Sequence, residues 1–297
     1  MSGFLSRVGA LPVLGVGVST EYGAAAAPGA LDIAGLRAVA PHNAAFLEVG
    51  VEVAKGLDAD ARAWAAAGRP ATYHFLDLNL DEPEDQDAAW LDGVRALAGA
   101  LGAAWICGDA GLWHMGPRDR AHMMLLPPIL EPDAAAAMGA GVQALRAATG
   151  LEVLPENPPG AVFVGRMHLL DWFARLCEAG DTGMLLDAAH LAIFQRSRGH
   201  AARTGLDGFP LERVVELHIA GGVERVGPGG FGYVEDTHAV DVLPETWEIV
   251  EAVVAGAPNL RAVVFECERN RVEETLPVFA RIHALLRGHP LLGRGAA

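Results

Sequence analysis

The sequence predicts a closed (β/α)8 barrel, the TIM-barrel architecture, on three observations. Eight short, mostly apolar segments alternate with Ala- and Leu-rich segments of helical spacing. The apolar segments lack the strict polar alternation of half-exposed strands, which is typical of parallel strands covered on both faces. The chain has 297 residues, enough for one barrel, and no linker or internal repeat divides it. We therefore expect a single domain over residues 1–297, with the barrel between about residues 13 and 286.

The eight predicted strands are short and end at polar or glycine-rich positions. In chain order they are Val13–Ser19, Phe46–Val51, Ala71–Leu78, Ala104–Cys107, Leu151–Pro155, Gly183–Asp187, Val214–Ile219 and Ala262–Cys267. A doubly wound open sheet is the alternative for such an alternation. It is the weaker prediction because no G-x-G-x-x-G or G-x-x-x-x-G-K turn follows any of these strands.

Six helices stand out between the strands through their apolar spacing. They are Leu57–Ala67, Asp85–Leu101, Pro132–Thr149, Met167–Ala179, Pro244–Val254 and Arg271–Leu286. N-cap aspartates and glycines just past the C-termini are expected at Asp58, Asp133, Gly102, Gly150 and Gly180. Three longer loops are predicted to be lids or substrate walls, and they are Leu112–Pro132, Arg196–Pro210 and Gly221–Tyr233.

The composition limits the classes of partner. The chain has 22 Lys and Arg against 37 Asp and Glu, a net charge of −15, which disfavours nucleic acid and anionic membranes as partners. Its three scattered cysteines make no disulfide framework and are typical of a reducing compartment. No secretory signal or membrane-length apolar segment is visible, so we expect a cytoplasmic protein.

Metal-capable side chains end six consecutive predicted strands, the third to the eighth. In a (β/α)8 barrel these carboxyl ends form the active face. The third to sixth strands give His74, Asp109, Glu156, and Asp187 with His190 three residues later. The seventh strand ends in His218 and is followed by Asp236 and His238, and the eighth ends in Glu266.

Each of these residues taken singly is usually a packing or capping residue. Together they are hard to explain by packing, because a buried carboxylate costs several kcal/mol unless it is paired or metal-bound. Four His, three Asp and two Glu exceed what one ion needs, so two or three metal ions are predicted. Ligands of N and O without thiolate suit Fe, Mn or Zn.

Several other residues have open roles. Glu48 and Glu52 on the second strand are candidate acids or bases, and Glu48 is equally consistent with a paired structural carboxylate. Cys107 and Cys267 lie at strand ends, where buried packing is the commoner role. His114 is a further candidate ligand, whereas no G-x-S-x-G nucleophile elbow is present.

The order of the motifs is similar to that of a known family. The chain reads PEN at the fifth strand, LLDAAH at the sixth and ELHIAGG at the seventh, and then DTH and VFECE. This combination resembles the multinuclear non-haem iron-dependent oxidases, (β/α)8 proteins related to the oxidase of methanobactin biosynthesis, in the xylose-isomerase-like superfamily. The resemblance extends from about Val13 to about Leu286.

The resemblance implies three metal positions. One would use His74, Asp109 and Glu156; a second would share Glu156 and add Asp187, His218 and Glu266; a third would take His190, Asp236 and His238. The fourth strand departs from the family's usual histidine, because CGDAGLW places Asp109 in register, with His114 as the alternative ligand. Catalysis is expected to depend most directly on His218, Asp236 and Glu266.

The resemblance also implies the reaction: an O2-dependent modification of a cysteine residue in a ribosomally made peptide, within natural-product biosynthesis. The cofactor would be two or three iron ions in a mixed Fe(II)/Fe(III) state, with O2 as co-substrate. The implied partners are a cysteine-containing precursor peptide and a small leader-binding protein.

Three alternatives stay open on the same barrel. A Mn- or Zn-dependent sugar isomerase or epimerase would use Glu156 and Glu266 as acid and base. A trinuclear zinc phosphoesterase acting on nucleic acid is disfavoured by the net charge of −15. A non-enzymatic binding protein would require a broken ligand set.

Overall fold

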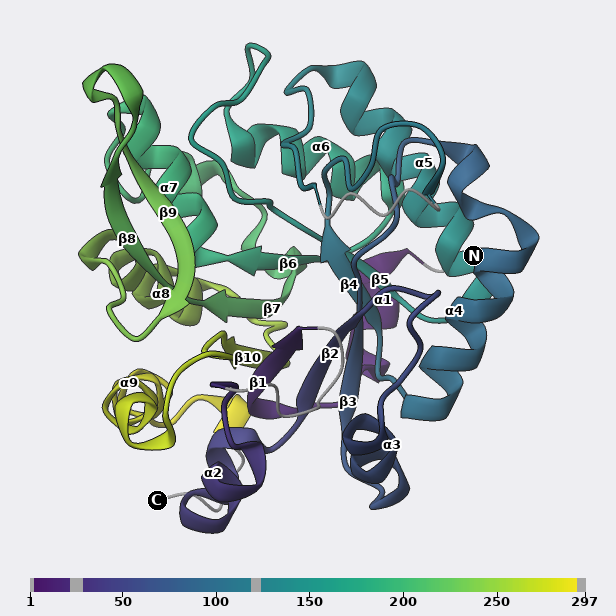
Figure 1. Cartoon of the computed structure of the whole chain (residues 1–297). Helices are drawn as coiled ribbons and strands as arrows, with labels where there is room; N and C mark the ends of the chain where they lie inside the picture. The colour runs from purple at the N-terminus through teal and green to yellow at the C-terminus, as the bar shows by residue number, and fades with distance from the viewer. Residues whose placement is uncertain (1–2, 22–28, 119–123, 293–297) are drawn as a thin grey trace.

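Eight parallel strands close into a barrel in the computed structural model, which describes residues 3–21, 29–118 and 124–292 (Figure 1). The strands neighbour one another in the order β1-β10-β7-β6-β5-β4-β3-β2. They are β1 Gly15–Glu21, β2 Leu47–Val51, β3 Ala71–Phe75, β4 Ile106–Asp109, β5 Val153–Glu156, β6 Met184–Asp187, β7 Val214–Ile219 and β10 Ala262–Phe265. The predicted closed (β/α)8 barrel is confirmed.

Helices surround the barrel and follow its strands (Figure 1). They are α1 Phe4–Arg7, α2 Ile33–Val39, α3 Ala59–Ala66, α4 Ala88–Leu101, α5 Pro132–Thr149, α6 Leu169–Gly180, α7 Ala188–Arg198, α8 Pro244–Gly256 and α9 Val272–Leu285. The six helices that stand out in the sequence correspond to α3, α4, α5, α6, α8 and α9. Within the described ranges, none combines the length and hydropathy that a bilayer-spanning helix needs.

Two of the predicted helix ends are wrong by a residue or two. Glu131 takes the N-cap position of α5, and Asp133 lies in the first turn, because Pro132 fits the first helical position. Gly180 is the last residue of α6, and Asp181 takes the left-handed conformation past it, with φ 46°. The predicted caps Asp58, Gly102 and Gly150 are confirmed.

The stretch predicted as the glycine-rich loop Gly221–Tyr233 contains regular structure. Residues Gly221–Val226 form β8, which pairs antiparallel with β9, Gly232–Ala239. This hairpin stands apart from the barrel sheet and lies beside α7 (Figure 1). The loop prediction failed because the four glycines Gly227, Gly229, Gly230 and Gly232 lie in or next to the turn, which masked the flanking strands. Of the loop Leu112–Pro132, residues 119–123 lie outside the described part of the chain.

The barrel interior is divided into an apolar floor and a polar upper part. Trp105, Leu154, Leu185 and Val264 are among the buried side chains that fill the floor, and Phe4 of α1 packs with them. Side chains alternate along a strand, so residues two positions later point inward one level higher. For Leu154, Leu185 and Val264, those positions hold predicted ligands.

Candidate metal centre

The period-two geometry of strands carries the predicted ligands inward. Leu154, Leu185 and Val264 belong to the floor, and two residues later Glu156, Asp187 and Glu266 follow on the same sides of β5, β6 and the end of β10. The parallel register places Asp109 opposite Glu156 and Asp187 opposite His218. Neighbouring strands therefore present their ligands at one level.

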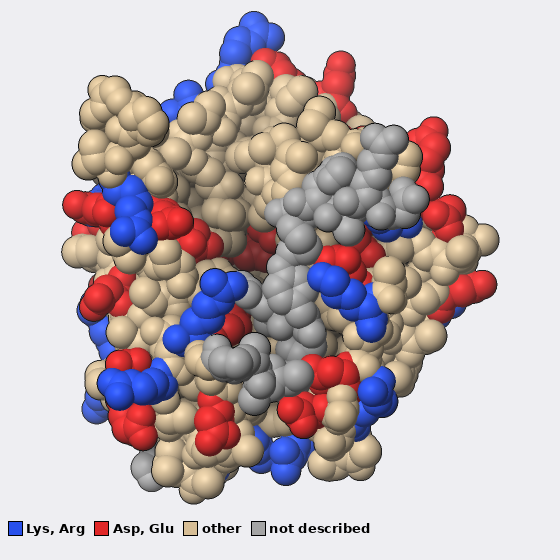
Figure 2. Space-filling model, viewed as in Figure 1, with Lys and Arg blue, Asp and Glu red and all other residues tan. Residues whose placement is uncertain are grey.

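All nine predicted ligands lie together at the carboxyl ends of the strands. Seven of them line one cavity of about 190 Å³, namely His74, Asp109, Glu156, His190, Asp236, His238 and Glu266. Asp187 and His218 are fully buried beside them. Seen from the same side as Figure 1, the space-filling view has acidic side chains at the bottom of a hollow near the centre of the face (Figure 2).

The first implied position, His74 with Asp109 and Glu156, is a compact cluster. One ligand atom from each of these residues lies within 4.8 Å of the others, and all three side chains are buried. His74 Nε2 is 2.9 Å from Glu156 Oε2. The carboxylate of Asp109 therefore lies beside His74 and Glu156, as the resemblance implies.

The second implied position is built around His218. Asp187, His218 and Glu266 form a buried cluster within the same 4.8 Å limit. His218 Nδ1 is 3.3 Å from Glu156 Oε1 and 3.3 Å from Glu266 Oε1. Glu156 thus contacts residues of both clusters.

The third implied position joins α7 to the hairpin. Asp187 caps α7 by accepting a hydrogen bond from the backbone N–H of His190. His190 Nε2 is 3.0 Å from Asp236 Oδ2, and His238 Nε2 is 3.3 Å from the same oxygen. Glu266 also approaches His238, at 3.7 Å. His238 adopts a φ of 49°, in the left-handed region that non-glycine residues rarely occupy.

The unpaired atoms of this region fit bound cations. Among the described residues, thirteen buried side-chain nitrogen or oxygen atoms lack a hydrogen-bond partner, and seven of them belong to His74, Asp109, Glu156, Asp187, His218, Asp236 and Glu266. Such atoms are rare in folded proteins, because a buried polar atom without a hydrogen bond costs free energy. Their concentration at seven of the nine predicted ligands is what a set of metal ligands requires.

In the metal-free protein, bound protons replace metal cations at these side chains. Burial raises the pKa of Asp109 to about 8, and the charge of Glu156 adds to that shift. Burial disfavours the charged form of His74, but the hydrogen bond to Glu156 and the surrounding carboxylates raise its pKa to about 9. Burial likewise raises the pKa of Asp187 well above its usual range.

The metal-free protein is expected to lose stability as the pH rises from 6.5 to 9. Folded His74 holds its proton up to about pH 9 and folded Asp109 up to about pH 8, against 6.5 and 3.8 for the unperturbed groups. The folded state therefore binds more protons than the unfolded state in this window. Linkage then lowers the free energy of unfolding as pH rises, by on the order of 3 kcal/mol for His74 alone.

Thermal melting of chelator-treated protein across this pH range measures the effect. The metal-loaded protein should show a smaller decline, since bound ions replace the protons. An equal decline in both forms would assign the titrating groups to another part of the molecule.

Anchoring residues fix the histidine rings, and the sequence did not assign this role to any of them. Asn157 O accepts from His190 Nδ1 at 2.8 Å, and Glu268 Oε2 lies 2.7 Å from His238 Nδ1. His218 Nε2 lies 3.2 Å from Glu48 Oε2. In each case one ring nitrogen is held and the other faces the carboxylates, the arrangement that sets the tautomer of metal-binding histidines. The i, i+2 spacing of Glu266 and Glu268 is the one signal that pointed to Glu268.

Replacing Glu48 by glutamine is expected to weaken metal binding by about 10- to 100-fold, because the group that orients His218 loses its charge. Glu52→Gln, directly after the same strand, is the matched control, since Glu52 pairs with Lys55 at 2.7 Å. Competition with a chromogenic chelator measures both affinities. Equal affinities would mean that Glu48 is a packing residue.

Two further open residues are held by hydrogen bonds of their own. His114 is held at both ring nitrogens, by Asp85 Oδ2 at 2.7 Å and by the carbonyl of Gly116 at 2.7 Å. It is thus unavailable as the alternative to Asp109. Cys107 is buried, and its thiol donates to Glu48 Oε2 at 3.1 Å. No thiol belongs to the metal-capable clusters found among the described residues.

The chain matches the family described as "RiPP precursor modification enzyme MbnB/TglH/ChrH" over residues 34–285. RiPPs are ribosomally synthesised and post-translationally modified peptides. The chain belongs to this family. The resemblance read from PEN, LLDAAH, ELHIAGG and DTH is therefore confirmed.

Curated relatives carry the name UPF0276 protein. One from Rhizorhabdus wittichii is 26% identical over 187 residues, which cover 63% of this chain and 65% of that protein, just under two thirds of its length. One from Bordetella pertussis is 27% identical over 223 residues, which cover 72% of this chain and 75% of that protein. Their names assign no activity.

Solved structures share the barrel. A xylose isomerase-like TIM barrel protein from Mycobacterium smegmatis, in complex with magnesium, is 12% identical with a TM-score of 0.60, covering 94% of this chain and 98% of that chain. The 3-keto-D-glucoside 4-epimerase of E. coli is 16% identical with a TM-score of 0.51, covering 93% of this chain and 99% of that chain. At these identities the likeness shows the fold alone.

Proposed function

We propose that this chain is a multinuclear non-haem iron-dependent oxidase that uses O2 to modify a cysteine residue of a ribosomally made precursor peptide in the cytoplasm. The observation that carries the proposal is the ring of buried, unpaired N and O atoms at the carboxyl ends of the strands, in a chain of the RiPP-modifying family. A small leader-binding protein is the proposed partner that delivers the peptide.

The ligand set supports two or three ions. Five of the predicted ligands are carboxylates, namely Asp109, Glu156, Asp187, Asp236 and Glu266. Together they supply up to five negative charges. Two or three divalent or trivalent cations would offset these charges. The three positions would be held as the resemblance implies. Bound iron would supply a Lewis acid for the substrate thiolate and exchange electrons with O2.

The chain's own residues prepare the cavity for a peptide. Glu268 keeps the Nδ1 of His238 engaged, so that Nε2 of this ring faces the cavity. Leu76, Trp113, Leu125 and Pro159 supply an apolar wall beside the ligands. This wall can contact the peptide next to its cysteine and exclude water from the reacting thiol.

The test is the metal content of anaerobically purified protein, together with Mössbauer spectra of protein grown on iron-57. We expect two or three iron ions per chain in a coupled Fe(II)/Fe(III) state, and O2 consumption that rises with a cysteine-containing peptide. Zinc or manganese without any gain on adding iron would favour the isomerase, epimerase or phosphoesterase. A site that takes no metal would leave only the binding protein.

A further inference from the structure

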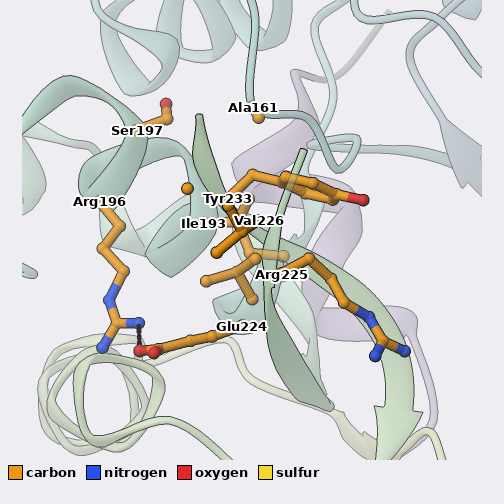
Figure 3. Close-up of a pocket in the computed structure, with 10 residues that line it drawn as sticks. Ala161, Ile193, Arg196, Ser197, Glu224, Arg225, Val226 and Tyr233 are labelled. Carbon is orange, nitrogen blue, oxygen red and sulfur yellow. Dashed lines mark hydrogen bonds and ion pairs between the residues drawn. The ribbon is translucent and has the colours of Figure 1, made fainter. Parts of the chain in front are cut away.

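A second cavity lies beside the metal centre, between α7 and the β8–β9 hairpin (Figure 3). Its volume is about 480 Å³. The side chains that define it are Ala161, Ile193, Ser197, Val226, Tyr233 and Val234. None of them belongs to the ligand set or to the residues that anchor it.

Three segments contribute residues both to the cavity lined by the predicted ligands, here called the metal cavity, and to the second cavity. Pro159 lines the metal cavity and Ala161 the second cavity; the same is true of His190 and Ile193 on α7, and of Asp236 and Val234 on β9. His190 and Ile193 are three residues apart on one helix face, and Asp236 and Val234 are two apart on one side of a strand. The contact between His190 and Asp236, at 3.0 Å, therefore stands at the boundary between the two cavities.

The residue spacing along α7 and β9 gives the distance between the two cavities. Three residues of helix rise about 4.5 Å, and two residues of strand about 7 Å. The far end, at Ser197 and Gly232, is about 10 to 13 Å along the same elements from His190 and Asp236. An extended peptide advances about 3.3 to 3.6 Å per residue, so two or three residues cover the distance to the middle of the cavity.

The charges around the cavity are already paired within the protein. Arg196 lies 2.5 Å from Glu224, the contact drawn in Figure 3, and 2.9 Å from Glu245. Arg225 lies 2.7 Å from Glu235. Each of these five charged side chains therefore has an oppositely charged partner within the protein.

Apolar surface supplies the remaining lining. Ile193 and Val234 are buried in its wall, and the Tyr233 ring, stacked at 6.3 Å on Phe231, is 37% exposed. Val226 at the edge of the cavity is 78% exposed, which leaves its surface open to contact by a ligand. Such a lining favours an apolar or aromatic side chain over a charged or small one.

We propose that this cavity binds an apolar or aromatic side chain of the substrate peptide, two or three residues away from the residue that reacts at the metal centre. The inference rests on the proposed function, because it takes the substrate to be a peptide. It adds a sequence requirement to the peptide. The side chain two or three residues from the reacting residue determines the affinity, because it binds in the cavity between α7 and the hairpin.

The probes are N-acetylated, C-amidated peptides with one central cysteine on a Gly/Ser background. Each carries Phe, Leu, Ala or Asp at one position, two or three residues before or after the cysteine. Calorimetric titration into metal-loaded protein without O2 gives the dissociation constants. In one of these placements the Phe and Leu peptides should bind about 10- to 100-fold more tightly than the Ala and Asp peptides.

Ser197→Trp fills the cavity from an exposed position and should abolish this preference. Ala201→Trp adds the same bulk at an exposed position outside the cavity and should keep it. Val226→Asp is the second variant, because it places a charge on the lining without changing a buried residue. Equal melting temperatures establish that the variants are folded.

The two proposals fail separately. Selective binding of the Phe and Leu peptides without any change of the cysteine on adding O2 would overturn the oxidase and keep the subsite. Equal affinities for all four neighbours, or a preference that survives both Ser197→Trp and Val226→Asp, would overturn the subsite, whether or not the cysteine is modified.

Discussion

Replacing Glu156 by glutamine is expected to remove at least one metal ion per chain and to lower catalytic activity roughly 1,000-fold. Glu156 Oε2 lies 2.9 Å from His74 Nε2, and Oε1 lies 3.3 Å from His218 Nδ1 and 3.6 Å from His190 Nδ1. One carboxylate therefore contacts a histidine of each implied metal position. Glutamine keeps the shape but loses the charge, and its amide offers a single ligand oxygen.

Glu152→Gln is the matched control for this substitution. Glu152 precedes the same strand at the opposite end of the barrel, where it pairs with Arg7. Elemental analysis of both variants after identical anaerobic purification gives the metal content per chain. Full occupancy in Glu156→Gln would show that Glu156 is not a bridging ligand, and a loss in Glu152→Gln would indicate that global stability controls the metal content.

Asp236→Asn is expected to remove one ion per chain and to lower activity at least about 100-fold while the barrel stays folded. Its carboxylate approaches His190 and His238, the other two ligands of the third implied position, at 3.0 and 3.3 Å. Asp236 is on the hairpin, which adds no strand to the barrel sheet. The melting temperature of chelator-treated protein should therefore change little.

Glu235→Gln controls for changes to the hairpin itself. Glu235 is exposed on the same strand and pairs with Arg225 at 2.7 Å, away from the ligands. Iron-57 Mössbauer spectra would separate the positions, because Asp236→Asn should lose one component and keep the rest. Loss of all the iron would mean that the three positions bind as one cooperative unit.

The order of the strands and the identity of the clustered residues could be predicted from the sequence. Parallel strands of a barrel are local apolar segments, and a polar residue at the end of each is visible without knowing its neighbours. His74, Glu156, His218 and Glu266 were found in this way, because barrel closure brings all strand ends to one face. The helix α7 was less visible, since its apolar and ligand residues are buried on nearly every side.

The tertiary structure alone decided which residues complete the centre. Glu268 reaches both Ser19, 249 residues away, and His238, and Glu48 reaches His218 across 170 residues. Hydrogen bonds over such separations depend on how β1, β2, β7 and β10 meet around the barrel, which local patterns do not contain. The same holds for His114, which pairs with Asp85 instead of entering the site.

The sequence by itself determined the barrel, the set of nine clustered side chains and the family. The distances within the clusters, the anchors on the histidines and the cavity between α7 and the hairpin came only from the tertiary structure. The physical reason is that strand periodicity fixes the direction of each side chain locally. Distances between side chains are fixed by packing of elements that are remote in sequence.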